Sequence, residues 1–397
     1  MTTLNETPRG NRIHIGFYGR RNSGKSSLIN AFTGQQVSIV SEVAGTTTDP
    51  VFKPMEVYGL GPCVFIDTAG FDDIGELGEI RIEKTRKAAE KTDIAVLVFS
   101  DEEMDKEMEW YSYFKKKNTP VLSVINKADT RTDVNHLQVL VEKKIGTKPL
   151  LVSAKNRMGI DAMKEGLVRL LPEDYGMETI TGDLVEDGDL VLLVMPQDIQ
   201  APKGRLILPQ VQTIRDLLDK KCLVMSVTTD KLESALAVMA KPPKLIITDS
   251  QVFKSVYEKK PKDSLLTSFS TLFAAYKGDI RYYVKSAKTI DKLTEESKVL
   301  IAECCTHAPL SEDIGREKLP RMLRQRIGSE LTVDIVSGTD FPAELSGYDL
   351  VIQCGACMFN RKYVMTRIDR AKDQEVPMSN YGIVIAYLTG IIDEICY

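Results

Sequence analysis

Short apolar runs and longer stretches of helical spacing alternate along the first 172 residues. Short apolar runs of about three to eight residues, bounded by polar or turn residues, have the pattern of strands in a parallel sheet. These runs are Ile13–Tyr18, Val51–Tyr58, Cys63–Ile66, Ile94–Phe99, Val121–Ile125 and Leu150–Val152. Helical spacing covers Ser27–Phe32, Gly75–Glu90, Met104–Lys117 and Ile160–Leu171. Strands that alternate with helices predict a mostly parallel α/β sheet with right-handed connections.

The same alternation continues to the end of the chain and predicts an α/β fold of three α/β domains, over residues 9–172, 173–262 and 263–397. In the middle domain, strands are predicted over Leu190–Met195, Cys222–Val227 and Lys244–Thr248, with helices over Leu208–Lys221, Lys231–Met239 and Gln251–Lys259. In the last domain, helical spacing covers Leu265–Ala275, Ile280–Leu293, Leu319–Ile327 and Arg361–Ala371, and strands are predicted over Lys298–Ala302, Leu331–Val336 and Leu350–Ile352. A small sheet with an exposed edge often pairs with a second copy, so we expect a homodimer contact in the middle domain.

Composition narrows the class of protein. The 397 residues are 43% hydrophobic and 27% charged, which is typical of a soluble globular chain. No apolar run is long enough to span a bilayer, and the polar start, Met1–Arg12, lacks a signal core. We therefore expect a cytoplasmic protein without a membrane partner. Residues 171–397 are net acidic, which argues against a module that binds nucleic acid.

A phosphate-binding motif follows the first predicted strand. The residues from Gly19 to Ser26 fit the pattern G-x-x-x-x-G-K-[S/T], and a helical run follows them. Backbone N–H groups of such a loop face phosphate oxygens, while the lysine reaches the β- and γ-phosphates and the serine binds Mg²⁺. The predicted nucleotide-binding residues here are Gly19, Asn22, Ser23, Gly24, Lys25, Ser26 and Ser27.

Two further loops complete the γ-phosphate side of this predicted site. Asp67 ends the strand Cys63–Ile66 and can hold Mg²⁺, and Gly70 three residues later can offer its N–H to the γ-phosphate. The loop before Val51 contains Thr47. We expect Lys25, Thr47 and Gly70 to be the catalytic residues, and Ser26, Thr47 and Asp67 to hold Mg²⁺.

The base is predicted by two later motifs. Asn126-Lys127-Ala128-Asp129 follows one strand, and Ser153-Ala154-Lys155 follows the next. The Asp129 carboxylate can accept hydrogen bonds from both N1–H and the 2-amino group of guanine, a donor pair that adenine lacks. Asn126, Lys127, Asp129, Ser153, Ala154 and Lys155 are therefore predicted to bind GTP or GDP.

Four of the seven cysteines fall between residues 304 and 357, in two groups that each follow a predicted strand. These groups are Cys304-Cys305-Thr306-His307 and Cys354-Gly355-Ala356-Cys357. Soft thiolates at one sheet edge suit zinc or an iron–sulfur cluster. Cys305, Cys354 and Cys357 are the candidate ligands, whereas Cys304 has the pattern of a buried thiol, and His307 is a candidate fourth ligand.

The nucleotide motifs resemble a K⁺-dependent subgroup of the P-loop GTPases. In that subgroup an asparagine at the place of Asn22 binds K⁺ beside the phosphates, and the second threonine of the loop, here Thr47, binds Mg²⁺. Phe71 stands where many GTPases have the glutamine that orients water, and an apolar side chain cannot polarise water. The resemblance implies slow GTP hydrolysis that K⁺ stimulates.

The whole chain, with C-x-H and a distant C-x-x-C after the GTPase motifs, resembles the [FeFe]-hydrogenase maturation GTPases of the HydF family. The resemblance implies a [4Fe–4S] cluster on Cys305, Cys354 and Cys357, and a scaffold that carries a diiron precursor to apo-[FeFe]-hydrogenase. It further implies two radical-SAM maturases as suppliers and a homodimer or larger assembly.

Gln353 replaces the histidine that the HydF family has before its C-x-x-C, so the fourth cluster position is open to water, His307 or a carboxylate such as Glu303. The alternatives to this family are a ribosome- or tRNA-associated GTPase with a structural metal site and a GTPase stapled by zinc.

Overall fold

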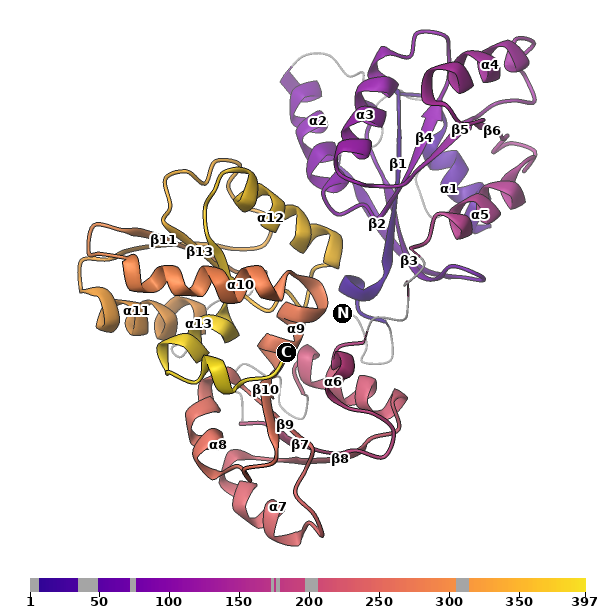
Figure 1. Cartoon of the computed structure of the whole chain (residues 1–397). Helices are drawn as coiled ribbons and strands as arrows, with labels where there is room; N and C mark the ends of the chain where they lie inside the picture. The colour runs from indigo at the N-terminus through magenta and orange to yellow at the C-terminus, as the bar shows by residue number, and fades with distance from the viewer. Residues whose placement is uncertain are drawn as a thin grey trace. The chain divides into compact units, whose positions relative to one another are not determined.

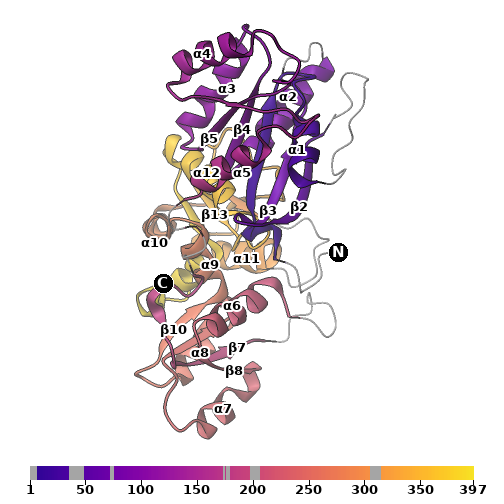
Figure 2. The same cartoon turned by 90° about the vertical axis from the view of Figure 1, so that its right-hand side faces the viewer.

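The computed structural model describes residues 7–34, 49–71, 76–172, 175, 179–196, 206–304 and 314–397. The chain divides into two compact units, Met1–Tyr175 and Gly176–Tyr397. Figures 1 and 2 show both units.

Six described strands of the first unit form one sheet in the order β2-β3-β1-β4-β5-β6. Its strands are β1 Ile13–Gly19, β2 Val51–Val57, β3 Gly61–Asp67, β4 Ile94–Phe99, β5 Val121–Ile125 and β6 Leu150–Leu151. Its helices are α1 Lys25–Thr33, α2 Glu76–Ala89, α3 Asp105–Lys116, α4 Val134–Ile145 and α5 Ile160–Arg169. Only β2 runs antiparallel to its neighbour, and every residue of β1 and β4 is buried. Helices cover both faces of this sheet, and a separate hydrophobic core lies on each side of it. The most apolar runs of the sequence form its central strands, because those strands are buried on both faces.

The second unit contains two described sheets, both fully parallel. The middle sheet has the order β10-β9-β7-β8 and the last sheet the order β12-β11-β13-β14. The strands are β7 Leu190–Val194, β8 Leu223–Val227, β9 Leu245–Thr248, β10 Leu265–Ser268, β11 Lys298–Ala302, β12 Thr332–Val336, β13 Leu350–Gln353 and β14 Met378–Asn380. The helices are α6 Leu208–Asp219, α7 Leu232–Val238, α8 Phe253–Lys259, α9 Phe269–Lys277, α10 Ile280–Ala287, α11 Leu319–Ile327, α12 Arg361–Asp373 and α13 Tyr381–Leu388.

Helix α9 lies between these two sheets and joins them. It packs against α6 beside the middle sheet and against α12 and α13 beside the last sheet, as both views show (Figures 1 and 2). One hydrophobic core runs through both parts, and it includes Leu192 and Ile246 of the middle sheet together with Leu300 and Val351 of the last. The second unit is therefore one packed body with two sheets.

The helix predicted over Leu265–Ala275 is wrong at its start. Leu265–Ser268 forms strand β10, which pairs in parallel with β9, and α9 begins only at Phe269. The Ser268 side chain accepts a hydrogen bond from the Thr271 N–H, so it caps the helix and separates it from the strand. Strand β10 lies beyond residue 262, where the sequence places a domain boundary, and it belongs to the middle sheet.

The two edges of the middle sheet differ. The C-terminal segment covers the β10 edge, where the Cys396 N–H donates to the Leu266 carbonyl over 2.8 Å. Among the described residues no segment pairs with the outer edge of β8, and on that strand the Leu223 side chain is 58% exposed. An unpaired edge with an exposed apolar side chain is a template for pairing with another chain.

We predict that Leu223→Lys weakens self-association of the chain, because a charge on the β8 edge opposes pairing of two copies. The expected change is at least about tenfold in the dimer dissociation constant, or ~1.4 kcal/mol. Light scattering over a dilution series measures it. Val139→Lys is the matched control, since Val139 of α4 is 61% exposed but lies in the other unit. Equal dissociation constants for Leu223→Lys and the parent chain would contradict the prediction.

Candidate functional site

The phosphate loop lies between β1 and α1, as its motif predicts. Gly24 has φ of 89°, and a Cβ at this position would lie 2.2 Å from the Asn126 Nδ2. Only glycine therefore fits at this turn. Asn22 also has a positive φ, 60°, and its side chain is exposed at the top of the loop.

The cationic and metal-binding side chains of the motif converge at this loop. The Lys25 ammonium is buried and donates to the carbonyls of Gly19 and Arg20 over 2.9 and 2.8 Å. The Ser26 Oγ donates to the Asp67 Oδ2 over 2.6 Å. A serine hydroxyl and a carboxylate at this distance can both face one Mg²⁺. Ser27 follows in α1, and Thr47 lies outside the described residues.

Asn126 connects the base-binding motif to the phosphate loop. Its Nδ2 donates to the Ser23 carbonyl over 2.9 Å, and its Oδ1 accepts from the Ala154 N–H over 3.2 Å. This one buried side chain thus links the phosphate loop to the loop of residues 153–155. Asp129 and Lys127 are exposed, and Lys127 has a φ of 61°. An exposed Asp129 carboxylate is open to the N1–H and 2-amino donors of a guanine.

In the second unit, Cys304 and the turn Cys354–Cys357 lie at the same edge of the last sheet. Ala302 at the end of β11 pairs in register with Gln353 at the end of β13. Two residues beyond Ala302, the Cys304 N–H donates to the Cys354 Sγ over 3.2 Å. Cys305, Thr306 and His307 lie outside the described residues, but position 305 directly follows the residue that contacts Cys354.

The residues beside the C-x-x-C turn, Cys354–Cys357, have partners of their own. The Gln353 Oε1 accepts from the buried Arg367 guanidinium over 3.4 Å, so this side chain is engaged inside the fold. The Glu303 carboxylate lies 3.0 Å from Arg316 and accepts from the Ser337 hydroxyl over 3.2 Å. For Glu303 to serve as a fourth cluster ligand, this ion pair would have to open.

Family profiles identify the two sheets of the second unit. Residues 180–278 match the profile described as the hydrogen maturase F dimerization domain, and residues 281–396 match the hydrogen maturase F tetramerization domain. Residues 14–127 match the profile described as a 50S ribosome-binding GTPase.

The chain belongs to the hydrogen maturase F (HydF) family. Its first unit is a P-loop GTPase domain, whose reaction is GTP hydrolysis with Mg²⁺ as the metal ion. It also carries the dimerization and tetramerization domains of the HydF family, which supports homo-oligomerization.

Curated relatives share the GTPase part of this HydF chain. GTPase Der of Wolinella succinogenes is 37% identical over 181 residues, which are 42% of this chain and 37% of that protein. The tRNA modification GTPase MnmE of Bordetella parapertussis is 33% identical over 172 residues, 42% of this chain and 36% of that protein. The chain thus spans just over a third of the length of these relatives.

Solved structures with a similar fold include Era of Aquifex aeolicus bound to GDP·AlF4⁻. That structure is 21% identical, with a TM-score of 0.37, and the match covers 54% of this chain and 92% of that chain. Within the part of the HydF chain that the structure describes, no helix is both long and apolar enough to cross a membrane.

The ionisable groups around the cysteines of this HydF chain have shifted pKa values. Burial raises the pKa of the Cys304 thiol well above its usual value, whereas a hydrogen bond from that thiol lowers the pKa of Cys354. The buried Lys277 ammonium lies beneath the C-x-x-C turn, and burial lowers its pKa to about 8, although the nearby cysteines oppose that change. The surroundings thus favour a thiolate at Cys354.

The donor set at this edge fits a thiolate-ligated metal group. Cys354 and Cys357 are both partly exposed, and the buried Lys277 beside them has no carboxylate partner among the described residues. No cluster of three metal-ligating side chains occurs among the described residues, and the candidates Cys305 and His307 lie outside them. The C-x-x-C turn therefore supplies two of the three predicted thiolates.

Phe71 has a structural role that the sequence pattern does not predict. Its ring is 2% exposed and stacks on Trp110 of α3, with centroids 5.9 Å apart and planes at 20°. Trp110 also stacks on Tyr18 of β1 at 5.5 Å. The residue in the place of the water-orienting glutamine is thus part of the core. The single tryptophan of the chain is the one signal in the sequence that could have pointed to this contact.

The same helix also holds the phosphate loop. Arg20 donates to the Glu107 carboxylate over 3.1 Å, and Glu107 is buried on α3. Burial raises the pKa of Glu107, whereas the Arg20 guanidinium opposes that change. Helix α3 therefore contacts both the phosphate loop, through Glu107, and the segment after Asp67, through Trp110.

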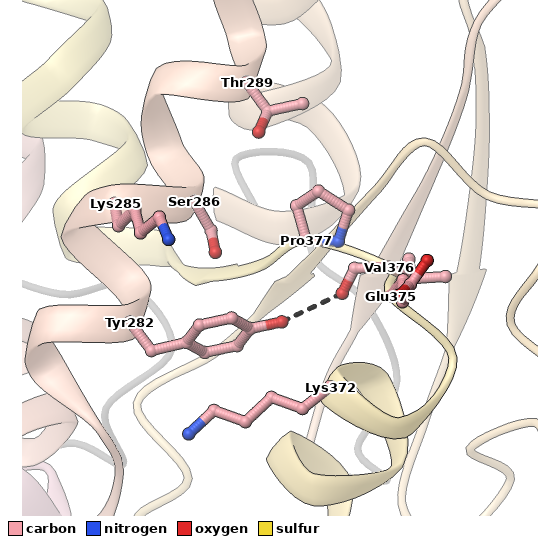
Figure 3. A pocket seen from close by; sticks show the side chains of 8 residues that line it. All are labelled: Tyr282, Lys285, Ser286, Thr289, Lys372, Glu375, Val376 and Pro377. Atoms are coloured by element: carbon pink, nitrogen blue, oxygen red, sulfur yellow. Dashed lines mark hydrogen bonds between the residues drawn. The ribbon is translucent and has the colours of Figure 1, made fainter.

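A separate pocket of about 270 Å³ lies in the part of the second unit that contains the last sheet (Figure 3). Side chains from α10 and from the end of α12 line it, and the Tyr282 hydroxyl donates to the Val376 carbonyl over 2.9 Å. Lys372 forms an ion pair with Asp279 at 2.8 Å and lies over the Tyr282 ring. None of the site residues predicted from the sequence lines this pocket.

We predict that Gly70→Ala slows GTP hydrolysis. A Cβ at Gly70 would lie 2.5 Å from the Arg21 backbone nitrogen of the phosphate loop, and backbone atoms cannot give way cheaply. The expected fall in kcat is at least about tenfold, equivalent to ~1.4 kcal/mol in the barrier. GDP affinity should change less, because Gly70 approaches the γ-phosphate side only.

Phosphate release under single-turnover conditions measures this effect, with GDP binding followed in parallel. Gly347→Ala is the control, because a Cβ there meets nothing within 4 Å. Parent-level hydrolysis by folded Gly70→Ala would refute the assigned role of Gly70.

Proposed function

We propose that this HydF chain is a GTP-hydrolysing scaffold of hydrogenase maturation that binds a [4Fe–4S] cluster. Cys305, Cys354 and Cys357 would hold three irons of the cluster, with an exchangeable fourth position for which His307 is a candidate ligand. The chain would receive a diiron precursor from two radical-SAM maturases and hand it to apo-[FeFe]-hydrogenase. A cluster with one exchangeable iron position supplies a site where such a cargo can bind reversibly.

The contact between Cys304 and Cys354 carries this proposal. It brings Cys304, the residue before Cys305 in the sequence, to the Sγ of Cys354, although 50 positions separate residues 304 and 354. This contact supports a shared site for the C-x-H and C-x-x-C motifs. Structural zinc sites have four closed ligands, commonly on two C-x-x-C turns, whereas this chain has one C-x-x-C and one C-x-H. An iron–sulfur cluster with one replaceable ligand fits this donor set better.

The GTPase residues would work as a switch for partner exchange. Lys25 would move from the loop carbonyls to the β- and γ-phosphates, and Ser26 and Asp67 would hold Mg²⁺ together with Thr47. Asn22 would bind K⁺ beside the phosphates, where a monovalent cation can supply the charge of an arginine finger. Because Phe71 is buried against Trp110, it cannot orient water, which supports slow intrinsic hydrolysis.

The competing function is that of a ribosome- or tRNA-associated GTPase with a structural metal. Der and MnmE favour it, but they match only the GTPase part of the chain. The acidic balance of residues 171–397 opposes it, since phosphate backbones attract basic surfaces.

The cluster is tested by anaerobic purification with iron and sulfide analysis and EPR. We expect about four irons per chain, as a [4Fe–4S] cluster requires. Cys354→Ser should lose most of the iron and the EPR signal, because it removes one of three thiolates. Cys63→Ser is the matched control, since Cys63 is buried in the GTPase unit and lies far in sequence from every proposed ligand of the iron–sulfur cluster.

A colourless protein that contains zinc would refute the cluster and support the structural-metal alternative. Added cyanide should change the EPR spectrum of the parent protein, because it can bind an open iron position. An unchanged spectrum would exclude an exchangeable fourth site.

Potassium activation is tested by comparing GTP hydrolysis in KCl and NaCl at equal ionic strength. We expect a kcat at least about tenfold higher in K⁺, equivalent to ~1.4 kcal/mol in the activation barrier. Asn22→Ala should remove this difference while GDP still binds. Equal kcat values in the two salts would contradict the assignment of Asn22.

A further inference from the structure

The strongest unexplained feature of the second unit is the buried cation Lys277. It is the last residue of α9, and its side chain is 1% exposed. Residue 277 falls within the part that matches the dimerization domain, whereas the C-x-x-C turn belongs to the part that matches the tetramerization domain. A charged group of one domain therefore lies inside the other domain's cysteine site.

All three donors of the Lys277 ammonium are directed to the backbone of this turn and the residues after it. They donate to the carbonyls of Ala356, Cys357 and Phe359 over 3.3, 3.2 and 2.7 Å. An ammonium has three donors, so this set uses its whole hydrogen-bonding capacity. The side chain thus fixes three carbonyls within four consecutive residues.

The turn itself needs such support. Ala356 has φ of 52°, in the left-handed region that residues with a Cβ rarely adopt. Its carbonyl accepts from Lys277 and also from the Phe359 N–H over 3.1 Å. These two hydrogen bonds hold a backbone conformation that alanine does not favour by itself.

The other end of α9 holds the start of the same turn. The Ser270 hydroxyl donates to the Asn380 Oδ1 over 3.0 Å, and the Asn380 Nδ2 donates to the Cys354 carbonyl over 3.2 Å. Helix α9 therefore supports the turn at both ends, through Ser270 and through Lys277.

The charge of Lys277 has no carboxylate partner within ion-pair distance among the described residues. A second buried cation, Arg367, lies nearby and stacks on the Phe359 ring at 4.8 Å. Buried charges normally require a partner of opposite sign. Thiolates at Cys354 and Cys357, with the metal group that they bind, would supply that negative charge.

We propose that Lys277 is a positioning residue through which the dimerization domain sets the geometry and the charge of the cluster site. Its hydrogen bonds fix the turn that presents Cys354 and Cys357, and its charge stabilises the more negative, reduced state of the cluster. The part about the reduced state rests on the proposed function, whereas the part about the turn does not.

The first experiment uses the metal-free chain and measures backbone hydrogen exchange over residues 354–360. In Lys277→Met we expect exchange of this segment to be at least tenfold faster, with the GTPase unit unchanged. Lys285→Met is the matched control, because it removes the same charge from an exposed position on α10. Parent-like exchange in Lys277→Met would overturn the positioning role whether or not a cluster binds.

The second experiment measures the midpoint potential of the reconstituted cluster by EPR-monitored titration. Loss of a buried positive charge should disfavour reduction about tenfold, which lowers the potential by about 59 mV for a one-electron couple. Ser270→Ala disturbs the same turn without a change of charge, so its potential should stay near that of the parent. Equal shifts in Ser270→Ala and Lys277→Met would overturn the role of the charge.

Two outcomes separate this proposal from the proposed function. Parent protein that binds no iron refutes the cluster, and the exchange experiment then still decides the positioning role. If Lys277→Met does not fold, Lys277→Gln takes its place, because its amide can donate hydrogen bonds but carries no charge. Lys277→Gln with a potential equal to the parent's would overturn the role of the charge, and the exchange of residues 354–360 in this variant would still test the positioning role.

Discussion

The parallel pairing of strands is the constraint on which both sites of this protein depend. Parallel strands end at the same edge of a sheet, so loops that are distant in sequence meet there. In the GTPase unit this pairing places Phe17 of β1 beside Asp67 at the end of β3, and the phosphate loop begins two residues after Phe17. In the last sheet it places Ala302 beside Gln353; Cys354 follows Gln353 directly, and Cys304 lies two residues beyond Ala302. One rule of sheet geometry thus brings together the loops of the phosphate site and two of the cysteines.

The two sites handle buried charge in opposite ways. At the phosphate loop, Arg20 is paired with Glu107, so that the protein itself balances the buried carboxylate. Beneath the C-x-x-C turn, Lys277 donates to three backbone carbonyls and lies over the Phe273 ring at 5.5 Å, and Arg367 lies among aromatic rings. Carbonyl dipoles offset only part of a full charge in a medium of low polarity. The surroundings of Lys277 and Arg367 are therefore suited to an anionic group that binds reversibly.

The sequence motifs predict the residues proposed to bind nucleotide better than they predict the residues that hold the binding loops in place. The P-loop and the motif around Asn126 have fixed spacings because phosphate and base binding require particular residues at particular positions, so they can be recognised from the sequence alone. The hydrogen bonds of Lys277 go to backbone carbonyls 79 to 82 positions away, and backbone carbonyls leave no pattern in the sequence. Leu265–Ser268 was equally ambiguous, since a short apolar run fits a strand or the start of a helix until its partner strand is known.

Phe71 shows that a residue's chemical type can be read from the sequence while its contacts cannot. An apolar residue there predicts that the side chain does not polarise water, but only the fold shows that Trp110 receives it. Helix α3 then contacts the phosphate loop through Glu107 and the loop after Asp67 through Trp110. In the second unit α9 has the corresponding place, because it joins two sheets and supports the turn at both ends. In each unit a helix outside the motif contacts the site at two points, α3 on two loops and α9 on one turn, so a change at either helix would alter the site without altering any proposed ligand.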